Sequence, residues 1–282
     1  MFVPVLLTLL VLVIVVIGLF VVVIVTKGKP PQGRALDYLN HKEIFQGRVI
    51  ACIGDSLTHG NLGTCWVDYL RDEFPQDIFL NEGINGDVVW QVHERLDPIL
   101  KCRPDLAILM IGSNDAIGSF DESSGKGYKK NNKLPEIPTF DAYIKLLPKL
   151  IDRLSEIPKI ALCTLPPIGE YPDSAINQHI GKFNDFIRRA AGEKNISVLD
   201  ASGSMWNELS QRTYPVKRNY NPKMTVIVKD MYGACIQHYI FKKPWDRVGE
   251  SRGQWLLFDQ IHLGERGARV MLSLTKVYIS TN

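Results

Sequence analysis

The stretch RVIACIGDSLTHG, residues 48–60, decides the fold of this chain. An apolar run ends at Gly54, and Asp55 and Ser56 follow at once. A short apolar run rich in β-branched side chains is typical of a parallel strand that is covered on both faces. Gly-Asp-Ser is ordinary turn chemistry, but here it also places a small hydroxyl just beyond a strand, where open parallel sheets bind ligands.

Four further apolar segments repeat this pattern and alternate with helical periodicity. Residues 175–192 carry an apolar stripe at helical spacing, as do residues 143–154, where Pro148 predicts a kink or a restart of the helix. The predicted strands span residues 48–54, 78–83, 106–112, 159–165 and 196–200. Alternation of this kind predicts a three-layer α/β/α domain with a five-stranded parallel sheet and right-handed crossovers.

Two stretches do not fit the alternation. One is the polar stretch 118–138, which reads as a loop, and the other is the aromatic-rich region 204–258. Each is a candidate for cover on the substrate side of the sheet, and each could equally be a surface insertion.

The composition is that of a globular protein without a nucleic-acid partner. Of 282 residues, 45% are apolar and 22% are charged, and the net charge of +3 is too small to indicate nucleic-acid binding. The five cysteines are scattered without CxxC spacing, which argues against a zinc site. Cys52 and Cys163 lie in strand-like runs and are expected to be buried thiols, whereas a disulfide among Cys65, Cys102 and Cys235 stays open.

The first 26 residues contain no charged side chain. At about 1.5 Å per residue a helix of this length crosses a hydrocarbon core of about 30 Å. A cleavable signal peptide has a basic start, a shorter apolar region and a small-residue cleavage site, none of which is present. The sequence therefore predicts a transmembrane anchor at residues 1–26, a linker at 27–46 and a globular domain at 47–282.

Residues suited to catalysis follow the predicted strands or lie near the C-terminus. Ser56 follows the first strand, Gly86 in NEGING follows the second, and Asn114 in GSND follows the third. Asp259 and His262 lie three residues apart in DQIH. A serine hydroxyl needs a base, a neutral histidine can supply it, and an aspartate can orient that histidine. The N–H groups of Ser56 and Gly86 and the Asn114 amide could stabilise the oxyanion formed by attack on an ester.

These blocks together resemble the GDSL esterases and lipases, also called SGNH hydrolases. The resemblance covers about residues 48–275, and GDSL at 54–57, the glycine of NEGING, GSND at 112–115 and DQIH at 259–262 carry it. It implies a flavodoxin-like fold without cofactor or metal, with Ser56 as nucleophile, His262 as base and Asp259 as its partner. It also implies that Gly86 and Asn114 join the Ser56 N–H in the oxyanion hole. Leu263 stands where many members have proline, which should alter the local turn but not the chemistry.

The resemblance implies a carboxylic ester substrate. It also bears on which side of the membrane the domain lies. Lys27, Lys29 and Arg34 follow the predicted anchor and favour a cytosolic domain by the positive-inside rule. Against this, NIS at Asn195 is a glycosylation sequon, and anchored hydrolases of this kind are often lumenal or extracellular, which we favour.

The same residues allow other interpretations of the site and of the domain. The G-x-S-x-G elbow of α/β-hydrolases is excluded because Thr58 occupies the position of its last glycine. His59 is expected to be a neighbouring polar residue rather than a second base. A catalytically silent α/β binding domain and a flavodoxin-like cofactor binder are the alternatives, although no phosphate cradle is recognisable in the sequence.

Overall fold

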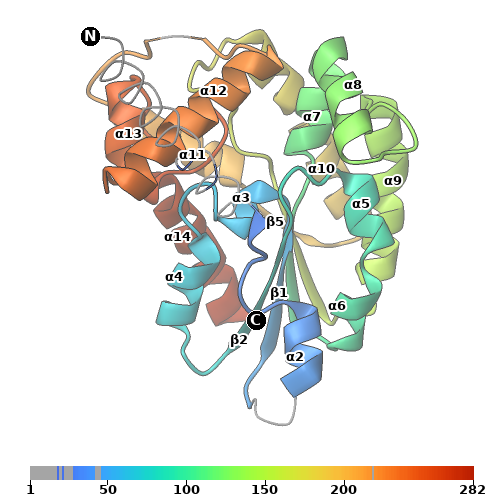
Figure 1. The fold of residues 1–282 in the computed structure, drawn as a ribbon. Helices are drawn as coiled ribbons and strands as arrows, with labels where there is room; N and C mark the ends of the chain where they lie inside the picture. Colours follow the sequence, from blue (N-terminus) through green and yellow to red (C-terminus); the bar gives the residue numbers. More distant parts are fainter. Residues whose placement is uncertain (1–17, 19–20, 22–27, 42–45, 218) are drawn as a thin grey trace, which may run out of the picture.

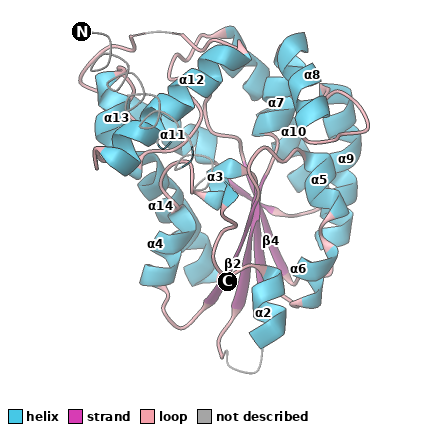
Figure 2. Ribbon diagram, in the orientation of Figure 1, coloured by secondary structure: helices cyan, strands magenta, loops and turns pink. Residues whose placement is uncertain are grey.

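A five-stranded parallel sheet forms the centre of the computed structural model (Figures 1 and 2). The structure describes residues 18, 21, 28–41, 46–217 and 219–282. The strands lie in the order β2-β1-β3-β4-β5, all neighbours being parallel. They are β1 (Val49–Gly54), β2 (Ile78–Gly83), β3 (Leu106–Met110), β4 (Lys159–Cys163) and β5 (Ser197–Leu199). The predicted strands and the flavodoxin-like order that the resemblance implied are confirmed.

Helices cover both faces of the sheet. Helices α2, α5, α6, α9 and α10 pack on one face and α4, α11 and α14 on the other, which gives the predicted three layers (Figure 1). The helices are α2 (Ala35–His41), α3 (Ser56–His59), α4 (Trp66–Glu73), α5 (Val89–Glu94), α6 (Asp97–Lys101), α7 (Ser113–Phe120), α8 (Glu122–Asn131), α9 (Phe140–Leu154), α10 (Ala175–Glu193), α11 (Ala201–Leu209), α12 (Met224–Cys235), the π-helix η2 (Ile236–Ile240), α13 (Trp245–Ser251) and α14 (Glu265–Thr281).

Successive residues of β1 belong to opposite layers of the core. Ala51 and Ile53 pack with the first set of helices, whereas Ile50 and Cys52 pack with the second. All four are fully buried. An apolar side chain is therefore needed at every position, which explains the uninterrupted apolar run in the sequence.

The register of the strands brings three predicted site segments to one edge of the sheet. Gly54, at the end of β1, pairs with Gly83 of β2 and with Met110 of β3. The residues that follow these strands therefore emerge side by side at the carboxyl edge, although the sequence separates them widely.

The two stretches outside the sequence pattern are mostly helical. The predicted loop 118–138 contains the end of α7 and the whole of α8, and region 204–258 contains α12, η2 and α13. Close packing of α7 and α8 explains the glycines in stretch 118–138, because a side-chain carbon on Gly125 would lie 2.5 Å from the Gly118 carbonyl oxygen. A glycine-rich segment therefore forms a helix that its own propensity does not favour.

Two further expectations are decided by the structure. All five cysteines are free, so the open disulfide among Cys65, Cys102 and Cys235 is not formed. Helix α9 continues through Pro148 and does not restart there.

The predicted anchor at residues 1–26 lies outside the described residues except for positions 18 and 21. Among the residues that the structure describes, no helix is long and apolar enough to cross a membrane.

Candidate active site

Ser56 begins a one-turn helix directly beyond β1. The Asp55 carboxylate caps this helix by accepting a hydrogen bond of 2.9 Å from the Leu57 N–H. A side-chain carbon on Gly54 would lie 2.3 Å from the Thr58 hydroxyl and 2.5 Å from a strand carbonyl. Gly54 is therefore required for close packing of the turn, which presents the Ser56 hydroxyl at the sheet edge.

Three predicted residues form one hydrogen-bonded chain. His262 Nε2 lies 3.0 Å from Ser56 Oγ, and His262 Nδ1 lies 2.7 Å from Asp259 Oδ2. All three side chains are buried. The histidine can therefore receive the serine proton on one nitrogen while the aspartate accepts a hydrogen bond from the other.

The Asp259 carboxylate is fixed on both oxygens. Its Oδ1 accepts hydrogen bonds from the N–H groups of Ile261 and His262 at 3.1 and 2.8 Å. Burial alone would raise the pKa of Asp259, but the charge of His262 and these donated hydrogen bonds hold it below its ordinary value. The carboxylate therefore stays ionised and can stabilise an imidazolium.

Gly86 and Asn114 line the same cavity as Ser56 and His262, and its volume is about 190 Å³. Gly86 has φ +82°, a conformation that favours glycine. Asn114 Nδ2 donates to the Asp87 carbonyl at 2.8 Å and makes a longer contact of 3.4 Å with Asp55 Oδ2. The structure thus brings all five sequence-predicted site residues to the carboxyl edge of the sheet.

Helix α8 braces both of these donor groups, which the sequence analysis did not foresee. The buried Tyr128 hydroxyl donates to Asn114 Oδ1 at 2.6 Å, and Asn132 Nδ2 donates to the Gly86 carbonyl at 2.6 Å. Burial raises the pKa of Tyr128 far above its ordinary value, so the hydroxyl keeps its proton. Because this hydroxyl donates to Asn114, it holds the amide oxygen toward Tyr128 and leaves the amide N–H groups on the opposite side.

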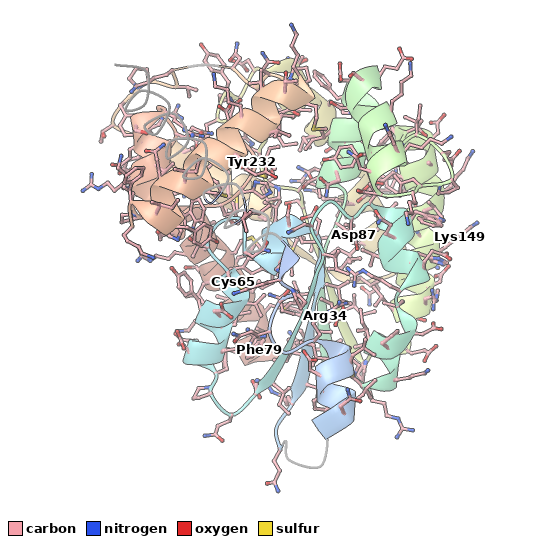
Figure 3. All side chains as sticks on the ribbon, in the orientation of Figure 1. Arg34, Cys65, Phe79, Asp87, Lys149 and Tyr232 are labelled. Atoms are coloured by element: carbon pink, nitrogen blue, oxygen red, sulfur yellow. The ribbon has the colours of Figure 1, made fainter. Side chains whose placement is uncertain are left out.

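A buried ion network holds the turn that carries Gly86. Glu82 Oε2 pairs with Arg34 at 2.6 Å and with Arg95 at 3.2 Å, and Arg95 also pairs with Asp87 at 2.7 Å. Arg34 and Asp87 are labelled in Figure 3. The Asp87 carbonyl is the acceptor for Asn114, so the network indirectly fixes the position of that amide.

Glu170 is a second residue that sequence reasoning missed. Its fully buried carboxylate accepts hydrogen bonds of 2.7 to 2.9 Å from the N–H groups of Trp255, Leu256 and Leu257 and pairs with Arg212 at 3.0 Å. These backbone groups lead into the segment that carries Asp259. Nothing local in PPIGE signals this role, because the acceptor and its donors are far apart in sequence.

Two more carboxyl groups lie buried beneath the cavity. Burial raises the pKa of both Asp55 and Asp115 to about 7. Asp115 accepts a hydrogen bond of 3.0 Å from the Val89 N–H. Burial also lowers the pKa of the neighbouring His59 to about 4, which keeps that ring neutral at pH 7. His59 does not line the cavity, in agreement with its expected role as a neighbouring polar residue.

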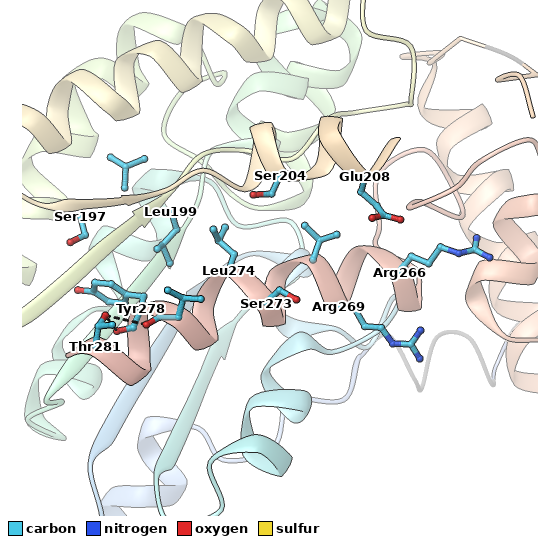
Figure 4. A pocket seen from close by; sticks show the side chains of 13 residues that line it. Ser197, Leu199, Ser204, Glu208, Arg266, Arg269, Ser273, Leu274, Tyr278 and Thr281 are labelled. Atoms are coloured by element: carbon cyan, nitrogen blue, oxygen red, sulfur yellow. Dashed lines mark hydrogen bonds between the residues drawn. The ribbon is translucent and has the colours of Figure 1, made fainter. Parts of the chain in front are cut away.

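A wider groove lies on another side of the domain. It has a volume of about 900 Å³ and runs between α14, α11 and the edge strand β5 (Figure 4). Ser56, Asp259 and His262 do not line it. The smaller cavity, which contains the hydrogen-bonded chain, is therefore the candidate active site.

No cluster of potential metal ligands occurs among the described residues. The cavity itself brings together side chains that can move protons and groups that donate hydrogen bonds. A hydroxyl, an imidazole and a carboxylate in series, beside an amide and a glycine turn, are suited to acyl transfer.

Comparison with known proteins agrees with this geometry. A model of the GDSL-like lipase/acylhydrolase family matches residues 52–270. The chain belongs to this family. Membership in the GDSL-like family makes it a carboxylic ester hydrolase, and the matched region includes every residue of the hydrogen-bonded chain. No curated protein matches the sequence.

Solved structures of other proteins share the fold of this chain. The acetylxylan esterase Axe2 from Geobacillus stearothermophilus has 19% sequence identity and a TM-score of 0.58, over 84% of this chain and 95% of that chain. LAE5, an α/β hydrolase enzyme from the metagenome of Lake Arreo in Spain, has 19% identity and a TM-score of 0.55, over 83% and 95% of the two chains. At such low identities these similarities establish the fold and not the substrate.

Proposed function

We propose that the protein is a membrane-anchored serine esterase that hydrolyses carboxylic esters through an acyl-enzyme at Ser56. The observation that carries this proposal is the hydrogen-bonded chain from Asp259 through His262 to Ser56, which opens into a cavity containing Gly86 and Asn114.

In the first step, Ser56 Oγ attacks the ester carbonyl carbon while its proton moves to His262 Nε2. Asp259 stabilises the imidazolium that forms. The carbonyl oxygen becomes an oxyanion, which the N–H groups of Ser56 and Gly86 and the Asn114 amide would stabilise. Asn114 keeps one amide proton on Asp87, and its longer contact with Asp55 is weak enough to be exchanged for the substrate oxygen.

Collapse of this tetrahedral intermediate breaks the bond to the leaving alcohol, which takes the proton from His262. A water molecule then attacks the acyl-enzyme, His262 accepts its proton, and Ser56 recovers that proton when the carboxylic acid leaves. The alcohol carries away the original Ser56 proton and the attacking water replaces it. Ser56 and His262 therefore end the cycle in the protonation states in which they began it, and the cycle needs no cofactor or metal.

The proposal includes an anchor at residues 1–26 and a linker at 27–46, with the hydrolase domain at 47–282 in the lumen or outside the cell. The uncharged N-terminal sequence supports the anchor. Asn195 supports the topology, because its sequon lies on an exposed turn after α10, where an oligosaccharide has room.

A panel of esters tests the function. The full-length protein should hydrolyse p-nitrophenyl esters, and Ser56→Ala should lower kcat at least about 1000-fold, as removal of an acyl-transfer nucleophile does. A lysophospholipid and an acetylated sugar in the same panel distinguish the substrate classes. Folded wild-type protein that hydrolyses none of these esters would contradict the proposal.

A further inference from the structure

An apolar stripe of α12 faces the candidate active site. Met224, Ile227, Val228 and Met231 recur at helical spacing, and all four line the cavity that contains Ser56. A stripe with this spacing normally packs against the core of a soluble protein. Here Ile227 stays half-buried and Val228 is 38% exposed, because they border the hollow.

The size of this hollow suits a short hydrocarbon segment. A cavity of about 150 Å³ with apolar walls holds a benzene molecule. The cavity of about 190 Å³ beside Ser56 therefore accommodates roughly six carbons. Leu62 and Ile261 extend the apolar wall, and the two methionines of α12 can adapt to the shape of a chain.

The chain segment that follows the predicted anchor contacts the rim of the same cavity. The Lys29 carbonyl accepts a hydrogen bond of 3.5 Å from the Asn61 side chain, which itself accepts one of 3.0 Å from Asn85. Asn85 lines the cavity. Only two residues separate Lys29 from the predicted anchor, and they span at most about 10 Å.

An exposed aromatic side chain and lysines lie close to this rim. The Tyr239 hydroxyl in η2 donates to the Asn61 carbonyl at 2.6 Å. Two residues later Phe241 is 66% exposed, and the exposed Lys242 and Lys243 follow it. Exposed aromatic and basic side chains together are typical of segments that lie in the headgroup region of a bilayer.

We propose that the active-site cavity faces the bilayer and binds the hydrocarbon chain of a membrane-borne lipid ester along the α12 stripe. This inference depends on the proposed esterase function and specifies its substrate class. The anchor brings the rim to the membrane, Phe241 and the two lysines hold it there, and the apolar wall takes the chain that leaves the bilayer.

A chain-length series tests the apolar wall. The full-length protein is assayed with p-nitrophenyl esters from acetate to decanoate and with acetate esters of alcohols from methanol to decanol. In one of the two series kcat/KM should rise by up to about fourfold per methylene until about six carbons. Ile227→Ser and Val228→Ser should remove most of this rise, whereas Val226→Ser, on the same helix but outside the cavity lining, should keep it.

Flat profiles in both series, with acetate hydrolysis intact, would overturn this inference and leave the esterase function standing. Failure to hydrolyse any ester would overturn both. A rise that persists in both stripe variants would show that the chain binds elsewhere.

A vesicle assay tests the orientation. Full-length protein is reconstituted into phosphatidylcholine vesicles, and p-nitrophenyl palmitate is supplied in the bilayer. Phe241→Ser should lower this rate at least about threefold, which is less than the full effect of burying a phenylalanine, and should leave soluble p-nitrophenyl acetate unaffected. Val277→Ser is the matched control, because Val277 is also 66% exposed but lies on α14 beside the other groove.

The double substitution Lys242→Glu with Lys243→Glu should likewise lower the palmitate rate, because lysine side chains at a bilayer surface extend their charges into the headgroup region. Equal effects of Phe241→Ser and Val277→Ser, or no effect of either, would overturn the proposed orientation of the cavity.

Discussion

Replacement of Tyr128 by phenylalanine removes one hydroxyl and tests how the Asn114 amide is held. The Tyr128 hydroxyl donates to Asn114 Oδ1 at 2.6 Å inside the protein. Leaving a buried acceptor without its donor costs about 1–3 kcal/mol. Part of that cost should appear in the transition state, because an amide that is free to turn can present its oxygen to the oxyanion.

We therefore expect Tyr128→Phe to lower kcat about 5- to 50-fold, which corresponds to about 1–2.3 kcal/mol. Full removal of the donor in Asn114→Ala should cost about 100- to 1000-fold. KM should change little in either variant, because the bond to the oxyanion forms only in the transition state. Initial rates with soluble p-nitrophenyl acetate measure both parameters.

Tyr220→Phe is the matched control. The buried Tyr220 hydroxyl has no hydrogen-bond partner among the residues that the structure describes, and burial raises its pKa as it does that of Tyr128. Its removal should change kcat less than about twofold. The thermal midpoint of each variant checks that it folds.

A double-mutant cycle decides whether Tyr128 acts through Asn114. If it does, Tyr128→Phe should have no further effect in the Asn114→Ala background. Additive losses, an equal loss in Tyr220→Phe, or a change confined to KM would refute the reasoning.

Three further expectations concern stability and topology. Burial raises the pKa of Asp115 to about 7, so between pH 4 and 7 the folded protein holds a proton that the unfolded chain has lost, and the free energy of unfolding should fall as pH rises. Measured by urea titration, Asp115→Asn should reduce the fall in unfolding free energy between pH 4 and 7 by at least about 1 kcal/mol, and the exposed Asp173→Asn should not. An unchanged fall in Asp115→Asn would contradict the assigned effect of burial. Glu170→Ala should lower the unfolding free energy by about 3–5 kcal/mol, because it leaves Arg212 and three N–H groups unpaired. The exposed Glu193→Ala should lower it little. Similar losses in the two variants would show that the Glu170 carboxylate does not stabilise the fold. Protein made in a eukaryotic secretory system should lose mass on glycosidase treatment and Asn195→Gln should not, and a wild-type protein without glycan would argue for a cytosolic domain.

The sheet could be predicted from the sequence because its signals are local. Strands β1, β2 and β3 are buried along almost their whole length, so each appears as an apolar run bounded by turn residues. Helix α10 could be predicted because its apolar stripe is regular, and it ends only one residue beyond the predicted stretch. Of the two outcomes predicted at Pro148, a restart does not occur, because the buried face of helix α9 keeps the helix continuous through the proline.

The five predicted site residues could be named because topology, and not distance in sequence, decides where they lie. Residues that follow parallel strands meet at one edge, so Ser56, Gly86 and Asn114 were expected together. Tyr128 and Glu170 could not be named, since their partners come from other elements and no local pattern marks them. The stripe of α12 has the same appearance in the sequence whether it faces a core or a cavity, and only the tertiary structure distinguishes the two.

The most direct test of the central claim is mass spectrometry of the full-length protein after reaction with a fluorophosphonate. The account predicts one adduct, on Ser56, which is lost in Ser56→Ala and greatly slowed in His262→Ala, while the matched His179→Ala reacts like wild type. Folded wild-type protein that stays unmodified, or an adduct that persists in Ser56→Ala, would contradict it.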